Sequence, residues 1–342
     1  MLASTGTGRV VILEARDLTK RFPWGRTFTG TRAWVRAVEG VSLSVAEGDT
    51  LALVGESGSG KTTTGRILAG LEAPTAGEVR YRGRALSALT GQAWREYRRG
   101  VQMVFQDSQA SLNPRKTVAQ ILEVALAAHG VAAGARRDAA AQLLVEVGLE
   151  PPAVFLGRFP HQLSGGQRQR INVARSLAAD PTVIIADEPV SALDLSVRAQ
   201  ILVLMQRLQQ QRGVGYLFIS HDLAVVRSVA RRVAVMYLGR IVEEGPTEAV
   251  FGKPLHPYTE ALLSATPVPN PRLARMRERI ILSGDVPSPV SPPPGCPFHP
   301  RCPIAQEICH REFPPQEDAG RGQVAACHFA GEIRVSAPSG PR

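Results

Sequence analysis

The sequence predicts an α/β fold in which a parallel sheet carries a phosphate-binding loop, followed by a small cysteine-containing extension. A glycine-rich loop lies between an apolar run, Thr50–Val54, and a run without proline, Thr63–Leu71. Two further apolar runs, Thr182–Ala186 and Tyr216–Ile219, flank a helical pattern over Val197–Leu208. This alternation is typical of βαβ units, and runs so apolar belong in a parallel sheet that is covered on both faces. The tail changes to proline-rich sequence, which indicates an extended segment.

Length and charge limit the classes of protein that fit. With 342 residues the chain exceeds the usual size of a single core, so we expect a large domain over 8–266 and an extension over 267–335. The net charge of +10 allows nucleic acid or an anionic membrane as a neighbour and selects neither. Neither a run of about 18 apolar residues nor a signal peptide is found, which favours a cytoplasmic chain.

Taken in order, the first elements are strands. Val10–Glu14 and Val41–Val45 are rich in β-type residues, and the breaks in Phe22–Arg36 predict a surface excursion between them. Gly77–Gly83 predicts a short strand between glycines, and Val101–Phe105 predicts another.

The pattern then changes from strands to helices. Apolar residues recur at helical spacing from Val118 to Leu126, and Ala139–Val147 continues without glycine or proline. We therefore expect a helical subdomain over about 107–178.

The glycine-rich loop is the first candidate site. Its glycines let several N–H groups face one centre, and the helix that follows adds the positive end of its dipole, so the geometry fits phosphate. We expect Lys61 to reach the β- and γ-phosphates and the Thr62 hydroxyl to bind Mg²⁺. A chance glycine turn before a lysine is the alternative, which the presence of only four lysines in the chain disfavours. The candidate residues are Gly55, Glu56, Ser57, Gly58, Ser59, Gly60, Lys61, Thr62 and Thr63.

Polar residues at strand ends form the second candidate site. Asp187 ends a buried strand on the side where open α/β sheets bind ligands, so it is expected to hold Mg²⁺. Glu188 follows, where it would orient and deprotonate the attacking water. Two acidic residues at a helix start are the alternative, which is weak beside a phosphate-binding loop. His221 and Gln106 follow other strands and are candidates by position, His221 for the γ-phosphate.

A second glycine nest opens a helix at Ser164, Gly165, Gly166 and Gln167. It offers another phosphate-facing helix N-terminus, although one phosphate chain does not need two such nests from one subunit.

With these motifs the chain resembles the ATPase subunits of ABC transporters. The resemblance rests on six ordered motifs, which are GESGSGKT, VFQD, LSGGQ, VIIADE, SALD and His221. It implies an ABC-type nucleotide-binding domain with a RecA-like core, an antiparallel β subdomain and a helical subdomain. It also implies ATP and Mg²⁺ as cofactors, Gln106 beside Thr62 and Asp187 at the Mg²⁺, Asp194 at the nucleotide, and Phe22 stacked on adenine. The LSGGQ segment would close on the nucleotide of another cassette.

Four longer motifs resemble the oligopeptide/dipeptide importer subgroup: VFQDSQASLNPRKTV, FPHQLSGGQRQRI, DEPVSALD and HPYTEALLSA. The resemblance implies an ATPase that powers uptake from the cytoplasmic face of the inner membrane. Its partners would be a second ATPase subunit in a heterodimer, two transmembrane permeases and, indirectly, an extracytoplasmic solute-binding protein, without nucleic acid. Peptides, nickel and oligosaccharides stay open as solutes. The alternative is a soluble ABC ATPase that acts on nucleic acid or ribosomes, but such proteins tend to have tandem cassettes or long coiled coils.

Four cysteines in the tail form the last candidate site: Cys296, Cys302, Cys309 and Cys327. Disulfides are disfavoured in a reducing cytoplasm, and the close CxxC pairs typical of zinc are absent. Widely spaced thiolates also ligate [4Fe–4S] clusters. The segment GDVPSPVSPPPGCPFHPRCP resembles the extension of peptide-importer ATPases, some of which hold such a cluster. We therefore predict a [4Fe–4S] cluster, with Zn²⁺ or free thiols as alternatives.

Overall fold

The computed structural model describes residues 9–26, 32–107, 111–266, 280–320 and 322–332. The start of the predicted extension, 267–279, and its last residues, 333–335, lie outside these ranges.

Eight strands form the central sheet, in the order β11, β12, β10, β9, β3, β8, β7, β6. The strands are β3 Thr50–Val54, β6 Val101–Val104, β7 Val183–Asp187, β8 Gly215–Ser220, β9 Arg232–Tyr237, β10 Arg240–Pro246, β11 Gln316–Asp318 and β12 Val324–Ala326. The strands from β9 to β6 pair in parallel, whereas β10, β12 and β11 add an antiparallel edge. Every residue of β3, β7 and β8 is buried, which confirms the predicted parallel sheet covered on both faces.

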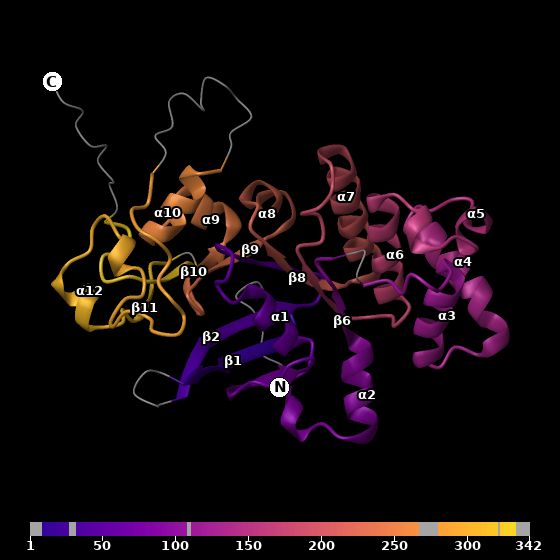
Figure 1. Ribbon diagram of the computed structural model, residues 1–342, viewed down its shortest axis with the longest axis horizontal. Helices are drawn as coiled ribbons and strands as arrows, with labels where there is room; N and C mark the ends of the chain where they lie inside the picture. Colours follow the sequence, from indigo (N-terminus) through magenta and orange to yellow (C-terminus); the bar gives the residue numbers. More distant parts are fainter. Residues whose placement is uncertain (1–8, 27–31, 108–110, 267–279, 321, 333–342) are drawn as a thin grey trace.

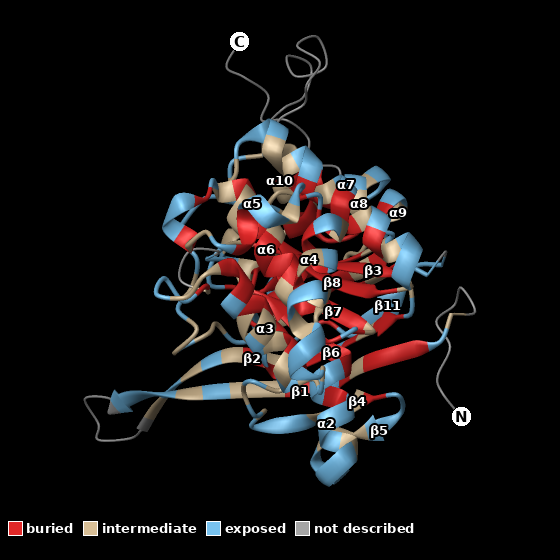
Figure 2. Cartoon of the chain, turned by 90° about the vertical axis from the view of Figure 1, so that its right-hand side faces the viewer, coloured by how far each residue is buried: buried red, intermediate tan, exposed pale blue. Residues whose placement is uncertain are grey.

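A second, antiparallel sheet has the order β2, β1, β4, β5. Its strands are β1 Val11–Arg26, β2 Arg32–Ala46, β4 Ala76–Tyr81 and β5 Arg84–Ala85. The surface excursion predicted for Phe22–Arg36 is regular in its described parts, because the residues on both sides of 27–31 continue β1 and β2 as an exposed hairpin that projects from the body (Figure 2). An exposed hairpin end tolerates its proline and glycine, since the register shifts between Pro23 and Gly25.

Helices cover both faces of the central sheet (Figure 1). They are α1 Lys61–Leu68, α2 Gly91–Gly100, α3 Val118–Ala128, α4 Arg136–Glu146, α5 Pro152–Leu156, α6 Gly165–Leu177, α7 Leu195–Arg212, α8 Leu223–Val229, α9 Thr247–Gly252, α10 Pro257–Ser264 and α12 Glu307–Arg311. Short 3₁₀ turns lie at Leu86–Ala88, Ala133–Ala135, Pro160–Gln162 and His299–Arg301.

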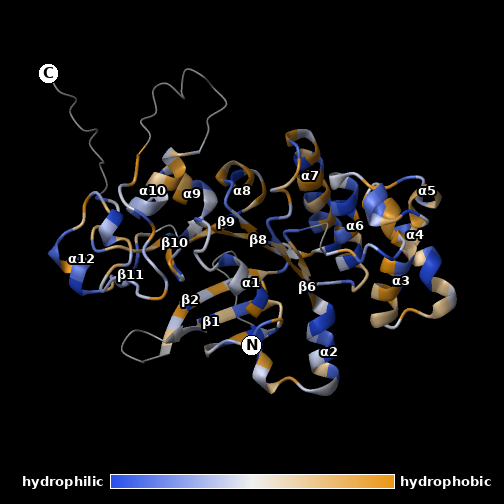
Figure 3. Cartoon of the chain, viewed as in Figure 1, coloured by the Kyte–Doolittle hydropathy of each residue, from blue (hydrophilic) through white to orange (hydrophobic). Residues whose placement is uncertain are grey.

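Helices α3 to α6 gather at one end of the molecule (Figure 1). The helical spacing from Val118 to Leu126 forms α3, which begins at a capping box between Thr117 and Gln120. Hydrophobic residues follow the central strands β8 and β9, whereas α2 is mostly hydrophilic (Figure 3). Within the described residues, no helix combines the length and the apolar character that crossing a membrane requires.

The extension shares the core of the larger part. Phe298 is fully buried, and its ring centroid lies 5.3 Å from that of Tyr237 on β9 and 5.5 Å from that of Tyr258 on α10. Cys296 and Cys309 belong to the same apolar cluster. Strand β12 pairs with β10, so the end of the chain completes the edge of the central sheet.

Candidate functional site

The glycine-rich loop joins β3 to α1 and is fixed by close packing behind it. Gly55 and Gly60 have φ values of 152° and 107°, a conformation that side chains with a Cβ rarely adopt. A Cβ on Gly55 would lie 2.2 Å from the carbonyl oxygen of Met236, and one on Gly60 would lie 2.2 Å from that of Ala37. The loop therefore requires glycine at both positions, as the phosphate-binding interpretation expects.

The middle of the loop is held by its own backbone. The Ser59 N–H donates to the Glu56 carbonyl oxygen at 3.2 Å, and the Ser59 carbonyl accepts the Gly239 N–H at 2.9 Å. Ser57 and Gly58 are exposed at the surface of the loop. Thr62 and Thr63 follow in the first turn of α1.

Lys61 is folded against this loop. Its Nζ donates to the carbonyl oxygens of Gly55 and Glu56, each at 2.8 Å. Burial lowers the pKa of Lys61, and the carboxylates of Glu188, Asp187 and Glu56 oppose that shift. The ammonium group therefore lies among the acidic groups at the strand ends, where a bound anion would find a positive charge.

A hydroxyl and a carboxylate meet at the carboxyl end of β7. Thr62 Oγ1 donates to Asp187 Oδ1 at 3.1 Å, and Asp187 is 2% exposed. Burial raises the pKa of Asp187, and the hydrogen bond from Thr62 partly offsets the shift. Hydroxyl and carboxylate oxygens are a donor set that suits Mg²⁺, so the residues present fit the expected ion.

Glu188 lies at the centre of the second cluster. Gln106 Nε2 donates to its Oε2 at 3.1 Å, and His221 Nδ1 lies 3.0 Å from its Oε1. These residues follow β6, β7 and β8, which are neighbours in the sheet. The three candidates that the sequence predicted separately therefore meet at one edge.

The backbone of Glu188 is strained, with a φ of 46°. Its N–H donates to the Ile219 carbonyl oxygen at 3.0 Å, and its own carbonyl accepts the Ser191 hydroxyl at 3.2 Å. Strained backbone of this kind is typical of functional sites, where neighbouring contacts hold it in place.

The second glycine nest lies at the start of α6, at the end of the molecule where α3 to α6 gather (Figure 1). Ser164 and Gln167 form a capping box, because Ser164 Oγ accepts the Gln167 N–H at 3.2 Å and Gln167 Oε1 accepts the Ser164 N–H at 3.0 Å. A Cβ on Gly166 would lie 2.4 Å from Val197 Cγ1, so glycine lets α6 approach α7. In the part of the chain that the structure describes, no hydrogen bond joins this nest to the glycine-rich loop.

Among the described residues, no hydrogen bond or ion pair joins the side chain of Asp194 or Phe22 to these clusters. Asp194 precedes α7, and it and Ser164 are exposed. Phe22 on β1 is half-buried, with Lys20 Nζ 4.9 Å from its ring centroid. Phe22 pairs with Val35 of β2, the strand whose Ala37 packs against Gly60.

Two residues missed by the sequence analysis contact the glycine-rich loop. The Tyr258 hydroxyl accepts the Glu56 N–H at 2.8 Å, and Arg301 pairs with the Glu56 carboxylate. They stand in HPYTEALLSA and CPFHPRCP, which carried the family resemblance, but no spacing could link them to a loop some 200 residues earlier.

The predicted metal centre at the cysteines is wrong. The four cysteines are free thiols, and three of them, Cys296, Cys302 and Cys309, lie in or against one apolar cluster. Among the described residues, which include all four, no group of three or more histidine, cysteine, aspartate or glutamate side chains could hold a metal ion. Neither the [4Fe–4S] cluster nor Zn²⁺ has support.

Burial keeps the cysteine side chains in the protonated thiol form. It raises the pKa of Cys302 to about 12 and that of Cys327 to about 11, so both are protonated at neutral pH. Buried cysteines of this kind behave as small apolar side chains, and Cys296 and Cys309 pack in the cluster around Phe298.

Two family models match successive parts of the chain, and relatives match nearly all of it. The ABC transporter family model matches residues 38–191, and the model described as "Oligopeptide/dipeptide transporter, C-terminal region" matches 242–309. The chain is 47% identical over 328 residues to the oligopeptide transport ATP-binding protein AppF of Bacillus subtilis, covering 95% of this chain and 99% of the relative. It is 50% identical over 317 residues to the dipeptide transport ATP-binding protein DppF of Escherichia coli, covering 92% and 93%.

Solved structures are similar over the larger part. The ATP-binding cassette MJ0796, solved as a dimer bound to ADP and Pi, matches with a TM-score of 0.60 and 30% identity, over 69% of this chain and 99% of that chain. The cbiO1 protein of Clostridium perfringens matches with a TM-score of 0.60 and 25% identity, over 71% and 91%. These comparisons confirm the predicted ABC-type fold and do not favour a soluble ATPase that acts on nucleic acid or ribosomes.

Proposed function

The chain belongs to the family of ATP-binding subunits of oligopeptide and dipeptide ABC transporters, and we propose that it hydrolyses ATP to power the uptake of short peptides. One observation carries this proposal. The Glu188 carboxylate is bonded by Gln106 and His221, one residue beyond Asp187, which bonds Thr62 in the first turn of α1. This arrangement supports the roles of base, metal-binding pair and phosphate-binding loop for residues at one sheet edge.

The loop and the metal pair would bind the nucleotide. Lys61 would contact the β- and γ-phosphates, and Thr62, Asp187 and Gln106 would hold Mg²⁺. Bound Mg²⁺ neutralises the charge that develops on the phosphoryl group. Phe22 would stack on the adenine from the neighbouring hairpin.

Glu188 would accept the proton of the attacking water. The hydrogen bonds from Gln106 and His221 reach different carboxylate oxygens, so they fix the orientation of the group. His221 is 59% exposed in its side chain, which leaves it accessible to the γ-phosphate.

A second cassette would complete the site. Ser164 and Asp194 are exposed, which leaves both available to a neighbouring subunit. The cassette MJ0796 is described as a dimer bound to ADP and Pi. We propose that Ser164 to Gln167 and Asp194 close on the nucleotide of a second, different ATPase subunit, and that the partner returns the same contact.

The remaining partners are membrane proteins. We propose that two permease subunits form the path for the solute, that a solute-binding protein delivers it, and that this chain binds the cytoplasmic face of the membrane. The relatives are named as transport proteins for oligopeptides and dipeptides, which supports peptides over nickel or oligosaccharides. We also propose the division into 8–266 with helices over about 107–178, and 267–335.

Reconstitution tests the proposal. The chain is co-expressed with permease subunits and a second ATPase subunit of an oligopeptide or dipeptide transporter, and the complex is placed in vesicles with labelled dipeptide, oligopeptide, nickel or oligosaccharide. We expect ATP-dependent uptake of peptide, and none from the same complex carrying Lys61→Ala. Uptake of another solute alone would contradict the peptide assignment, and failure of the purified complex to hydrolyse ATP would contradict the ATPase itself.

A further inference from the structure

The extension sends one arginine into the glycine-rich loop. Arg301 Nη1 lies 2.9 Å from Glu56 Oε2, and Nη2 lies 3.2 Å from Glu56 Oε1. The Arg301 side chain is only 9% exposed, and that of Glu56 is 28% exposed. Two parallel, charge-assisted bonds in a partly buried setting give a strong and directional pair. The contact therefore fixes the loop more firmly than a surface ion pair would.

Aromatic residues hold both partners in place. The buried Tyr258 accepts the Glu56 N–H through its hydroxyl at 2.8 Å, so both the backbone and the side chain of Glu56 are held. Tyr258 packs on Tyr237, with ring centroids 4.6 Å apart. The Tyr237 hydroxyl lies 3.5 Å from Arg301 Nη1. Phe298, three residues before Arg301, is buried between the two tyrosines, so the position of the arginine is set by the core.

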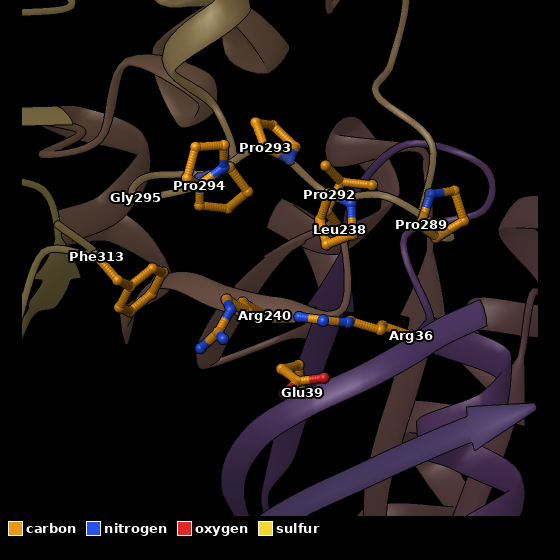
Figure 4. A pocket seen from close by; sticks show the side chains of 11 residues that line it. Arg36, Glu39, Leu238, Arg240, Pro289, Pro292, Pro293, Pro294, Gly295 and Phe313 are labelled. Atoms are coloured by element: carbon orange, nitrogen blue, oxygen red, sulfur yellow. The ribbon is translucent and has the colours of Figure 1, made fainter. Parts of the chain in front are cut away.

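The proline-rich segment of the extension contacts β2 and the turn between β9 and β10, both of which pack against the loop. Pro289 accepts the Arg36 N–H through its carbonyl oxygen at 3.0 Å. Figure 4 shows Pro289 and Pro292 beside Arg36 of β2 and Leu238 of the turn between β9 and β10. The N–H of Gly239 in this turn donates to the Ser59 carbonyl oxygen of the loop. Ala37, the neighbour of Arg36, supports Gly60. The extension therefore contacts the loop directly at Glu56 and supports it through β2.

Glu56 poses an electrostatic problem for a phosphate-binding loop. It follows Gly55, and its carbonyl oxygen accepts a bond from Lys61. A free carboxylate here would repel a triphosphate, because charges this close and partly screened from water interact strongly. In the described residues Arg301 is the cation that forms an ion pair with this carboxylate.

We propose that Arg301 is a positioning residue of the nucleotide site, which acts through Glu56 by neutralising its carboxylate and holding the loop. The inference rests on the proposed ATPase function. It assigns the extension a role in nucleotide affinity, since removal of Arg301 leaves the Glu56 charge uncompensated beside the phosphates. By linkage, nucleotide binding must stabilise the Arg301 contact in return.

A double-mutant cycle tests the proposal. Equilibrium binding of MgATP to the intact transporter complex is measured for wild type, Arg301→Ala, Glu56→Gln and the double variant. Arg301→Ala is expected to raise the Kd about tenfold, because the repulsive charge is exposed. With glutamine at 56 that charge is gone, so Arg301→Ala is expected to change the Kd by less than about threefold. Such non-additivity is the signature of residues that act on each other.

Controls separate this role from general support by the extension. Arg311→Ala removes an exposed arginine of α12 that pairs with Glu307 in the same extension, and its Kd is expected to match wild type. Arg301→Ala should raise KM for ATP and leave kcat within about twofold, because Glu188 is untouched. Arg301→Lys keeps the positive charge but cannot form the two parallel bonds of the guanidinium group, so an intermediate Kd is expected.

Two results would overturn the inference. One is a wild-type Kd for Arg301→Ala, and the other is an equal loss of affinity with glutamate or glutamine at position 56. If the Arg301→Ala complex fails to assemble, the same double-mutant cycle of Kd values is measured with Arg301→Lys and Glu56→Gln. A wild-type complex that binds but does not hydrolyse ATP would contradict the proposed ATPase, while the binding cycle would still decide the role of Arg301.

Discussion

At the level of single residues, the site depends on how Glu188 is held. Its carboxylate accepts bonds on both oxygens, and its backbone has a φ of 46° directly after β7. Asp187, one residue earlier, is buried and bonded to Thr62. Two neighbouring carboxylates thus have different surroundings, which supports different roles for them.

We expect Glu188→Gln to lower ATP turnover by about 10² to 10⁴-fold, because an amide keeps the shape but cannot accept the proton. Nucleotide binding should persist, as measured by equilibrium binding beside phosphate release. Glu78→Gln is the control, since this glutamate pairs with Arg80 on β4 away from the loop. Near-normal turnover in a complex whose other site is silent would exclude Glu188 as the base.

Lys61→Ala should act at the earlier step. Its loss removes the cation that lies among Asp187, Glu188 and Glu56, so we expect the Kd for MgATP to rise by at least about tenfold. Lys253→Ala, which removes an exposed lysine, should leave binding unchanged. Unchanged affinity in the Lys61 variant would show that the loop binds phosphate without this charge.

At the level of elements, the sequence predicted those that follow from a local pattern. Strands β3, β6, β7 and β8 stand near their expected positions because buried strands need continuous apolar runs. The pairing of β12 with β10 joins Ala325 to Glu243, far apart in the chain. No local pattern encodes such a pairing, so it escaped the sequence analysis.

The surroundings of the cysteines and of Arg301 likewise depend on tertiary packing, which no local sequence pattern encodes. The spacing of the cysteines could not separate metal ligands from buried thiols, because cysteines close together in the sequence are compatible with both. Burial of Cys296 and Cys309 beside Phe298 became visible only with the packing. Arg301 meets Glu56 through tertiary contacts alone, and in the sequence it is one arginine among 36.

A variant at the N-terminus of α6 tests the proposed contact with the nucleotide of a second cassette. Ser164 is exposed, and we expect Ser164→Arg to abolish turnover at the partner's nucleotide while nucleotide remains bound on this chain. The larger side chain would block closure of a second cassette on the nest. Site-specific crosslinking of a photoreactive ATP analogue reads the two sites separately, with Ser87→Arg on an exposed turn as control. Loss of nucleotide from this chain's own loop would contradict the proposed contact in trans.

At the level of the whole molecule, the extension and the larger part are joined by one core. Strands β12 and β11 extend the central sheet beyond β10, and the Glu243 carboxylate of β10 is buried where the Gln323 amide bonds it at 2.8 Å. Phe298 brings the extension between Tyr237 and Tyr258. An end of the chain packed in this way should unfold with the rest and not before it.

Phe298→Ala tests that cooperativity. The ring is fully buried, so its removal should cost about 3 to 5 kcal/mol in the free energy of unfolding. We expect one transition in denaturant, shifted to lower concentration, when it is followed both by tryptophan fluorescence and by circular dichroism. Phe313→Ala is the control, because this ring is 38% exposed and its contact with Arg240 contributes about 1 kcal/mol or less. Two separate transitions, with only the weaker one moved by Phe298→Ala, would show that the extension folds as its own unit. The loop would then keep its stability without the extension, and Arg301 would act on nucleotide affinity through its charge alone.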